Sequence, residues 1–394
     1  MAERERAHGG GRVVRPAGGA EIEVAYVRPA PSDGVPLVVL PGGPGMASVL
    51  PYRSLRNRAV RRGFDVVMME HRGIGLSRRT TDGRDIDPAA VTITAVVDDL
   101  AAVLDREGIE RAVIYGTSYG TYLAQVFGQR YPHLVAGMVL DSPMLSADGD
   151  VPVVRDHRRD LLWRGPGPAA AAARALLAAD VVPVREIGAV AQVVYEFAGE
   201  ATLAALLRAR AAGKAVRLWD MIIGVGGAEV EGAGQPMVVE PDLVANITHA
   251  ELGYGHAPDG LPLDPQETFS GAATSEFRGE PADLAAALPH FTWPLAVVSG
   301  ERDLRTPRPI AQRIVDLAPD AVLVPLAGLG HSALDMHALA ALTVARGVAM
   351  GSHTVLPGLA AEIARLPRRG ASGVLGPGLL GPVLKVGVGL SRLW

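Results

Sequence analysis

The feature that most constrains this chain is an alternation of short apolar runs with segments of helical periodicity. Each run is followed within two residues by a glycine or a charged residue, and such runs are typical of strands buried on both faces. They lie at residues 35–40, 64–69, 112–115, 137–140, 295–299 and 321–326. The clearest helical patterns lie at 50–62, 91–106, 119–130, 309–317 and 333–349. The alternation predicts an α/β fold whose mostly parallel central sheet is flanked by helices.

The alternation stops between about residues 144 and 290, where helical stretches are followed by a Pro-, Gly- and Asp-rich passage. We therefore expect a core in two parts, 1–143 and 291–394, with a mainly helical cap inserted at 144–290. We expect residues 21–27 to form an edge strand and residues 1–19 to form a loose arm. The Gly- and Leu-rich tail from about residue 367 is expected to pack loosely on the surface, with a weak membrane or partner contact as the alternative.

The composition excludes several classes of function. The chain of 394 residues has no cysteine, which removes thiol nucleophiles, disulfides and cysteine-ligated metals. A net charge of −4 without a clustered basic surface argues against nucleic-acid binding. The N-terminus lacks an apolar core segment, and no apolar run is long enough to span a membrane. We expect a cytoplasmic protein without a metal or other cofactor, and the sequence specifies no oligomeric state.

The first chemical motif is Gly-Thr-Ser-Tyr-Gly at residues 116–120. It follows one predicted strand and opens a predicted helix, which is the context of a strained turn that exposes a nucleophile. Small residues must flank such a turn, and both flanks are glycine. The motif predicts Ser118 as the nucleophile, and the alternative is a serine at an ordinary helix N-cap.

A second motif, Pro-Gly-Gly-Pro-Gly at residues 41–45, follows an earlier strand. Acyl transfer develops negative charge on a carbonyl oxygen, which two preorganised N–H groups can stabilise. We expect these donors to be the amides of Gly43 and Tyr119, with Gly42 supporting the loop. The alternative is a plain Pro-Gly turn.

The general base and its acid are expected on the loops after the last two strands. His331 lies in Gly-Leu-Gly-His-Ser (328–332), and Asp303 lies in Gly-Glu-Arg-Asp (300–303). The chain order Ser, Asp, His fits a triad in which the acid orients the imidazole. Glu301 and Asp141 are rival acids, because each also lies at or close to a strand end.

Residues 70–77, Glu-His-Arg-Gly-Ile-Gly-Leu-Ser, form a further loop at a strand end. Arg72 has five donors and is expected to support the oxyanion loop from behind by binding backbone carbonyls. His71 could border the pocket.

These five motifs together resemble the proline iminopeptidase family of the α/β-hydrolase fold. The resemblance covers the core, about 1–143 and 291–350, and it implies release of N-terminal residues, often proline, from peptides. Pro41 and Glu70 depart from the family, which usually has His and Asp at these positions. In that family, cap carboxylates bind the free amine, but the candidates here, Glu196, Glu200, Glu251 and Glu276, match no motif residue by residue.

Three hypotheses follow. The first is a serine aminopeptidase of the proline-iminopeptidase type acting on small peptides, and the second is a carboxylesterase acting on small esters. The third is a non-catalytic ligand receptor on the same fold, because fold alone does not decide function.

Overall fold

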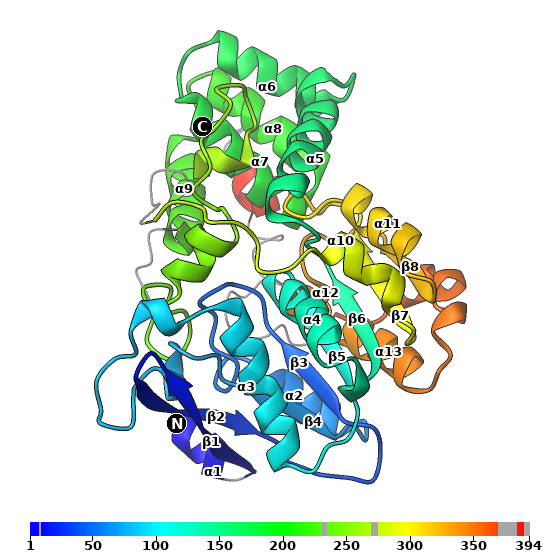
Figure 1. Cartoon of the computed structure of the whole chain (residues 1–394). Coiled ribbons are helices and arrows are strands. Elements are labelled where there is room, and N and C mark those ends of the chain that lie inside the picture. The colour runs from blue at the N-terminus through cyan, green and yellow to red at the C-terminus, as the bar shows by residue number, and fades with distance from the viewer. Residues whose placement is uncertain (8, 231–234, 269–274, 369–383, 390–394) are drawn as a thin grey trace.

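The computed structural model describes residues 1–7, 9–230, 235–268, 275–368 and 384–389. Its centre is an eight-stranded sheet in the order β1-β2-β4-β3-β5-β6-β7-β8, in which β2 pairs antiparallel with β1 and with β4 while the other pairs are parallel (Figure 1). The strands are β1 Gly10–Ala17, β2 Ala20–Val27, β3 Leu37–Leu40, β4 Val66–Met69, β5 Ala112–Thr117, β6 Val135–Asp141, β7 Leu295–Gly300 and β8 Ala321–Leu326. The predicted mostly parallel α/β sheet is confirmed.

Helices cover both faces of the sheet because successive strand residues point to opposite sides. In β3, Val38 and Leu40 enter one hydrophobic core, while Leu37 and Val39 enter the other. Helices α3 (Ile93–Arg106), α4 (Tyr119–Arg130), α10 (Leu284–Ala287) and α11 (Arg308–Leu317) pack into the first core. The second core takes α2 (Arg53–Val60), α12 (Ala333–Met336), α13 (Ala338–Ala349) and α14 (Ala360–Arg365). Burial on both faces explains why the central strands are continuous apolar runs.

The strand order reverses at β3, which has β4 on one side and β5 on the other. In open α/β sheets, ligands bind beyond the carboxyl ends of the strands at such a switch point. The loops that follow β3 and β5 are residues 41–45 and the turn at Ser118, so the topology alone brings these two motifs together.

The expectation of a loose arm at residues 1–19 is wrong. Residues 2–7 form helix α1 (Ala2–Ala7), and β1 pairs with β2 along its whole length. Gly11 lies against the ring of Tyr26, and a Cβ on Gly10 would come within 2.1 Å of the carbonyl oxygen of Tyr26, so this strand needs a glycine. The glycines that suggested a loop from sequence therefore serve close packing in an edge hairpin.

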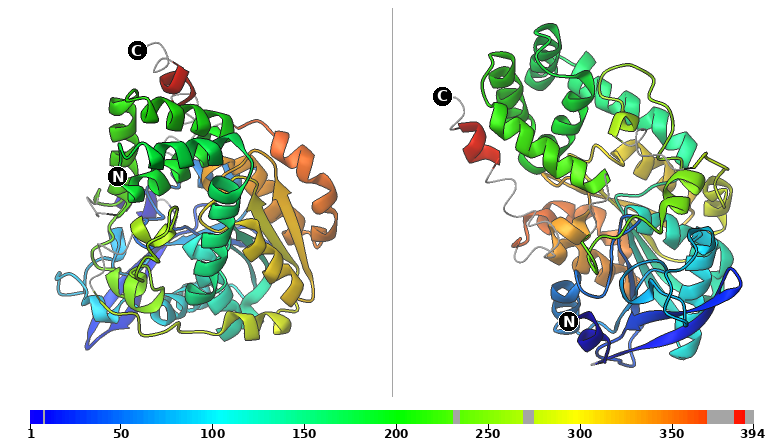
Figure 2. Two further views of the ribbon diagram at one scale, coloured as in Figure 1. Left: turned by 90° about the horizontal axis from the view of Figure 1, so that it is seen from above. Right: turned by 90° about the vertical axis from the view of Figure 1, so that its left-hand side faces the viewer.

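The segment between β6 and β7 is helical, with a hydrophobic core of its own. Its helices are α5 (Ala147–Arg159), α6 (Pro168–Ala178), α7 (Val184–Ala198), α8 (Glu200–Ala211) and α9 (Val216–Val230). Buried side chains from α6 to α9, among them Leu176, Val194, Leu206 and Trp219, form one cluster. Figures 1 and 2 show α6, α7 and α8 stacked together beyond the sheet. We call this helical insertion the cap.

The described part of the C-terminal tail does not pack loosely. Leu384 and Val388 are buried in the cap core, and Gly387 lies against Leu218 of α9. Apolar burial of this kind anchors the segment to the cap. The rest of the tail, 369–383 and 390–394, lies outside the described residues. In the described part of the chain, none of the helices combines the length and apolar character needed to cross a bilayer.

Arg72 and Asp99 form a buried ion pair that joins the loop after β4 to helix α3. The guanidinium donates to both oxygens of Asp99 at 2.6 and 2.7 Å, and a third donor binds the carbonyl of Ala90 at 2.8 Å. Arg72 and Asp99 are almost fully buried. Removing one partner of such a pair leaves an uncompensated charge in the interior.

We therefore expect Asp99→Ala to lower the free energy of unfolding by about 3 to 5 kcal/mol, measured by urea denaturation. Arg84→Ala is the control, since it removes an exposed pair with Asp82 and should leave the unfolding curve unchanged. A destabilisation of Asp99→Ala as small as that of the control would contradict a structural role for the pair.

Candidate active site

Ser118 lies in a strained turn between β5 and α4. Its φ is 51° and its ψ is −121°, in a region that non-glycine residues rarely adopt, and its side chain makes no capping hydrogen bond. A Cβ on Gly120 would lie 2.1 Å from the carbonyl oxygen of Leu40, and one on Gly116 would lie 2.2 Å from that of Gly120. Both flanking glycines are therefore required by close backbone packing, and the alternative of an ordinary helix N-cap does not fit this turn.

Residues 41–45 lie directly beside the turn at Ser118. A Cβ on Gly42 would lie 3.3 Å from Cβ of Ser118, so Gly42 is the residue of this loop that touches the candidate nucleophile. Gly43 follows with a φ of 124°. Among the described residues, the N–H groups of Gly43 and Tyr119 have no acceptor, so both are available to an oxyanion.

The side chain of Tyr119 is held by His71, which borders the site as expected. Nε2 of His71 lies 3.0 Å from the phenol oxygen of Tyr119, and its Nδ1 lies 2.6 Å from the carbonyl oxygen of Arg72. Burial lowers the pKa of His71 to about 4, so the ring is neutral at pH 7 and acts as a fixed hydrogen-bonding group.

Asp303 and His331 meet as the sequence predicts. Nδ1 of His331 lies 3.0 and 3.1 Å from the two carboxylate oxygens. The N–H groups of Arg305 and Thr306 and the hydroxyl of Thr306 also donate to Asp303. Burial would raise the pKa of this carboxyl, but the charge and hydrogen bond of His331 outweigh it and lower the pKa to about 2. Burial would lower the pKa of His331, but Asp303 outweighs it and raises the pKa above its ordinary 6.5.

The two rival acids have other partners. The carboxylate of Glu301 accepts from the N–H of Gly328 at 2.7 Å. The carboxylate of Asp141 accepts from the N–H groups of Ala333 and Leu334 and from the hydroxyl of Tyr115. Neither carboxylate contacts the imidazole of His331 in the described structure.

The loops that carry Ser118 and His331 are joined through the residues next to them. Oγ1 of Thr117 and Oγ of Ser332 lie 2.9 Å apart in the interior. The hydroxyl of Ser118 makes no hydrogen bond with a described residue, so its bond to Nε2 of His331 stays a prediction. Catalytic hydrogen bonds in proteins without substrate are often long and tighten only when substrate binds.

Arg72 does not support the oxyanion loop (residues 41–45) in the structure, so this prediction is wrong. Its guanidinium points to α3, and the segment just after residues 41–45 is instead held by Glu70, whose carboxylate accepts from the N–H groups of Ser48 and Val49 at 2.7 and 2.9 Å. Glu70 is fully buried, and burial raises its pKa. The sequence offered a signal for this role, because a carboxylate that ends a buried strand needs donors nearby.

A strap from the cap segment, residues 238–241, lies along the oxyanion loop. The N–H of Ala47 donates to the carbonyl of Val238 at 3.0 Å, and the N–H of Glu240 donates to the carbonyl of Gly45 at 2.8 Å. The carboxylate of Glu240 also accepts from the N–H of Gly75. No periodic pattern marks this strap in the sequence, so sequence reasoning missed it.

Three of the four candidate cap glutamates already bind protein groups. Glu200 accepts weakly from the N–H of Ala169 at 3.5 Å, and Glu251 accepts from the N–H of Ile93 at 2.8 Å. Glu196 is buried on α7 beside the loop of Asp303, and its carboxylate accepts from the N–H of Leu304 at 3.2 Å and from Nε of Arg305 at 3.3 Å.

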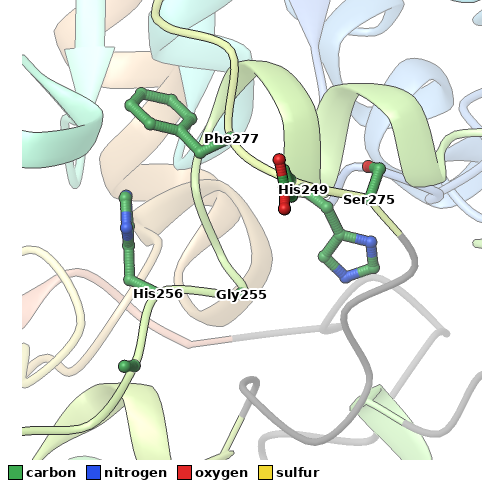
Figure 3. Close-up of a pocket in the computed structure, with 7 residues that line it drawn as sticks. His249, Gly255, His256, Ser275 and Phe277 are labelled. Carbon is green, nitrogen blue, oxygen red and sulfur yellow. The ribbon is translucent and has the colours of Figure 1, made fainter.

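Glu276, the fourth candidate, is exposed on a hollow of about 520 Å³ in the cap segment, lined also by His249, His256 and Phe277 (Figure 3). The ring of Phe277 packs edge-on against His256, with centroids 4.9 Å apart. Within the described ranges, no group of three or more His, Asp or Glu side chains is placed to share a metal ion.

Comparison with known proteins agrees with this architecture. A family profile described as "alpha/beta hydrolase fold" matches residues 35–180. A proline iminopeptidase of Neisseria meningitidis is 33% identical over 108 residues, 27% of this chain and 32% of that protein. A probable proline iminopeptidase of Streptomyces coelicolor is 31% identical over 123 residues, 30% of this chain and 36% of that protein.

These matches span about a third of the length of the curated relatives. Among solved structures, the proline iminopeptidase of Mycobacterium smegmatis superimposes with a TM-score of 0.49 and 21% identity, covering 87% of this chain and 99% of that one. Together with the sheet order and the strand-end loops, the family match shows that this chain has the α/β-hydrolase fold and is a distant homologue of proline iminopeptidases over about 30% of its length.

Proposed function

We propose that this chain is a serine hydrolase that cleaves an acyl bond through an acyl-enzyme. The observation that carries the proposal is the hydrogen bond between Nδ1 of His331 and the buried carboxylate of Asp303, on a loop joined through Ser332 to Thr117, the neighbour of a serine at a φ of 51°. His331 takes the proton of Ser118 as the hydroxyl attacks the substrate carbonyl, and the amides of Gly43 and Tyr119 bind the oxyanion. His331 then protonates the leaving group, and water hydrolyses the ester of Ser118.

The chemistry needs no cofactor, because nucleophile, base and oxyanion donors all come from the chain. Asp303 holds His331 in the tautomer that carries a proton on Nδ1 and leaves Nε2 free to accept. The tautomer follows from the carboxylate, which can only accept at its low pKa of about 2.

At the finer level, we propose an aminopeptidase of the proline-iminopeptidase type. The support is the partial similarity to proteins of that name and the position of Glu196, a cap carboxylate beside the loop of Asp303. A substrate with a free α-amine would then place its charge near Glu196, and Arg305 would have to yield part of its contact.

The second candidate is a carboxylesterase. It is favoured because three of the four candidate cap glutamates already bind other protein groups. Glu196 is paired with Arg305, and Glu200 and Glu251 accept from backbone amides. If the exposed Glu276 also lies out of reach of Ser118, none of the four cap glutamates selects for an α-amine, whereas the acyl chemistry at Ser118 is the same for esters.

Assaying aminoacyl-β-naphthylamides beside p-nitrophenyl esters separates these two candidates. An aminopeptidase is expected to hydrolyse prolyl-naphthylamide and to lose most of its kcat/KM when the α-amine is acylated, because the amine contact is lost. An esterase is expected to hydrolyse the short-chain esters alone.

Ser118→Ala is the control for every substrate in this panel, and the loss of nearly all turnover is expected for it. If Ser118→Ala kept the wild-type rate on a substrate, the proposed nucleophile would be wrong. A wild-type protein that neither turns over any substrate nor reacts with a fluorophosphonate probe would favour the non-catalytic receptor.

The pair of Asp303 and His331 predicts a defined pH dependence. His331 must be neutral to accept a proton, and Asp303 raises its pKa above 6.5, so kcat/KM should fall as the pH drops through a midpoint above 6.5. Asp303→Asn removes the charge that raises this pKa while burial still lowers it. NMR titration of the His331 imidazole should therefore give a lower pKa in Asp303→Asn than in the wild type.

Asp320→Asn is the matched control, because Asp320 contacts His353 at 2.9 Å in a second Asp-His pair on the chain. This variant should leave the titration of His331 unchanged. An unchanged or higher His331 pKa in Asp303→Asn would show that the carboxylate does not hold the imidazole in solution.

A further inference from the structure

The end of strand β6 contacts the loops of all three proposed catalytic residues. The carbonyl of Asp141 accepts the N–H of Ser118 at 2.9 Å. Its carboxylate accepts the N–H groups of Ala333 at 3.0 Å and Leu334 at 2.7 Å, which begin helix α12 just after His331.

Ser142, the next residue, extends this contact. Its Oγ accepts the N–H of Ser332 at 2.9 Å, and Ser142 is one of the groups that lower the pKa of Asp303. Two consecutive side chains thus bind three consecutive amides that directly follow His331. Ser142 is held at a φ of 56°, a strained value for a side chain with a Cβ, and such strain persists only where surrounding contacts fix it.

Both residues are fully buried, so water does not replace these bonds. The hydroxyl of Tyr115 donates to Asp141 at 2.8 Å, which completes the set of donors around the carboxylate. Because one residue binds Ser118 through its backbone and the His331 loop through its side chain, any shift of that side chain changes the separation of the two loops.

We propose that Asp141 and Ser142 are positioning residues that set the distance between the Ser118 hydroxyl and the His331 imidazole. This inference rests on the proposed serine-hydrolase function and adds residues to its site. The role differs from that of Asp303, since neither side chain contacts the imidazole of His331.

Asparagine at position 141 tests the proposal because it keeps the size and removes one acceptor. In either orientation of the amide, its NH₂ group faces the N–H of Ala333 or of Leu334, so one donor meets another. The backbone bond to Ser118 is retained. The expected effect is a shift of the His331 loop relative to Ser118, and a misplacement of about 1 Å can cost about 100-fold in rate.

The chain offers a close control in Asp150. Asp150 is also buried, and one of its oxygens accepts from two consecutive amides, those of Leu145 and Ser146, at 2.7 and 3.1 Å. It makes no contact with Ser118 or with the His331 loop in the described structure. Asp150→Asn therefore makes the same buried Asp-to-Asn change without the proposed positioning effect, and its amide oxygen can still accept from both amides.

The experiment measures the second-order rate constant for fluorophosphonate labelling of Ser118, together with urea denaturation of each variant. We expect Asp141→Asn to label about 10- to 100-fold more slowly than the wild type, and Asp150→Asn to label within about twofold of it. With a substrate, Asp141→Asn should lower kcat while KM stays near its wild-type value.

Ser142→Ala keeps the test decisive if Asp141→Asn fails to fold. It removes the acceptor for the Ser332 N–H and should slow labelling by about two- to tenfold, the effect of one lost hydrogen bond. The positioning role would be wrong if Asp141→Asn and Ser142→Ala both labelled at the wild-type rate. It would also be wrong if Asp150→Asn slowed labelling as much as Asp141→Asn. A wild-type protein that does not label at all would instead refute the proposed function.

Discussion

The contact between the backbones after β3 and β5 is the constraint on which the rest of the site depends. Gly120 approaches the carbonyls of Leu40 and Pro41 so closely that no Cβ fits between them. This approach fixes the turn at Ser118 against Gly42. A positive φ at Ser118 costs free energy, and it persists because strand, helix and neighbouring loop together leave the turn no alternative.

Burial raises the pKa of the carboxyl groups in the site unless a nearby cation outweighs it. Asp141 and Asp303 are both buried after neighbouring strands, yet burial raises the pKa of Asp141 to about 6 while His331 lowers that of Asp303 to about 2. The difference fits their contacts, because the carboxylate of Asp141 meets neutral amides and a phenol, whereas Asp303 meets an imidazole that can carry charge. Only the second carboxylate is suited to stabilise an imidazolium.

Sequence reasoning found the features that strand ends impose. Each central strand is a buried apolar run, and the loops after β3, β5, β7 and β8 carry Gly43, Ser118, Asp303 and His331. Sequence reasoning failed where contacts between residues far apart in the sequence determine the local structure. The sequence of β1 predicts a loop, because the packing of Gly11 on Tyr26 leaves no local signal. The prediction for Arg72 is wrong because its partner on α3, Asp99, lies 27 residues away in the sequence.

The cap contacts both the loop that carries Asp303 and the loop that carries Gly43, so the substrate cannot be inferred from the core alone. Glu196 of α7 binds the N–H of Leu304 next to the acid, and residues 238–241 pair with the loop that carries Gly43. Under the proposed function, the core would determine how an acyl bond is attacked, while the cap would determine which acyl group reaches Ser118. Residues 238–241 lie in no helix or strand, and the pair of buried Glu196 and partly exposed Arg305 joins segments far apart in the sequence. Under the proposed function, substrate choice would depend on such contacts between distant segments, which local patterns predict least.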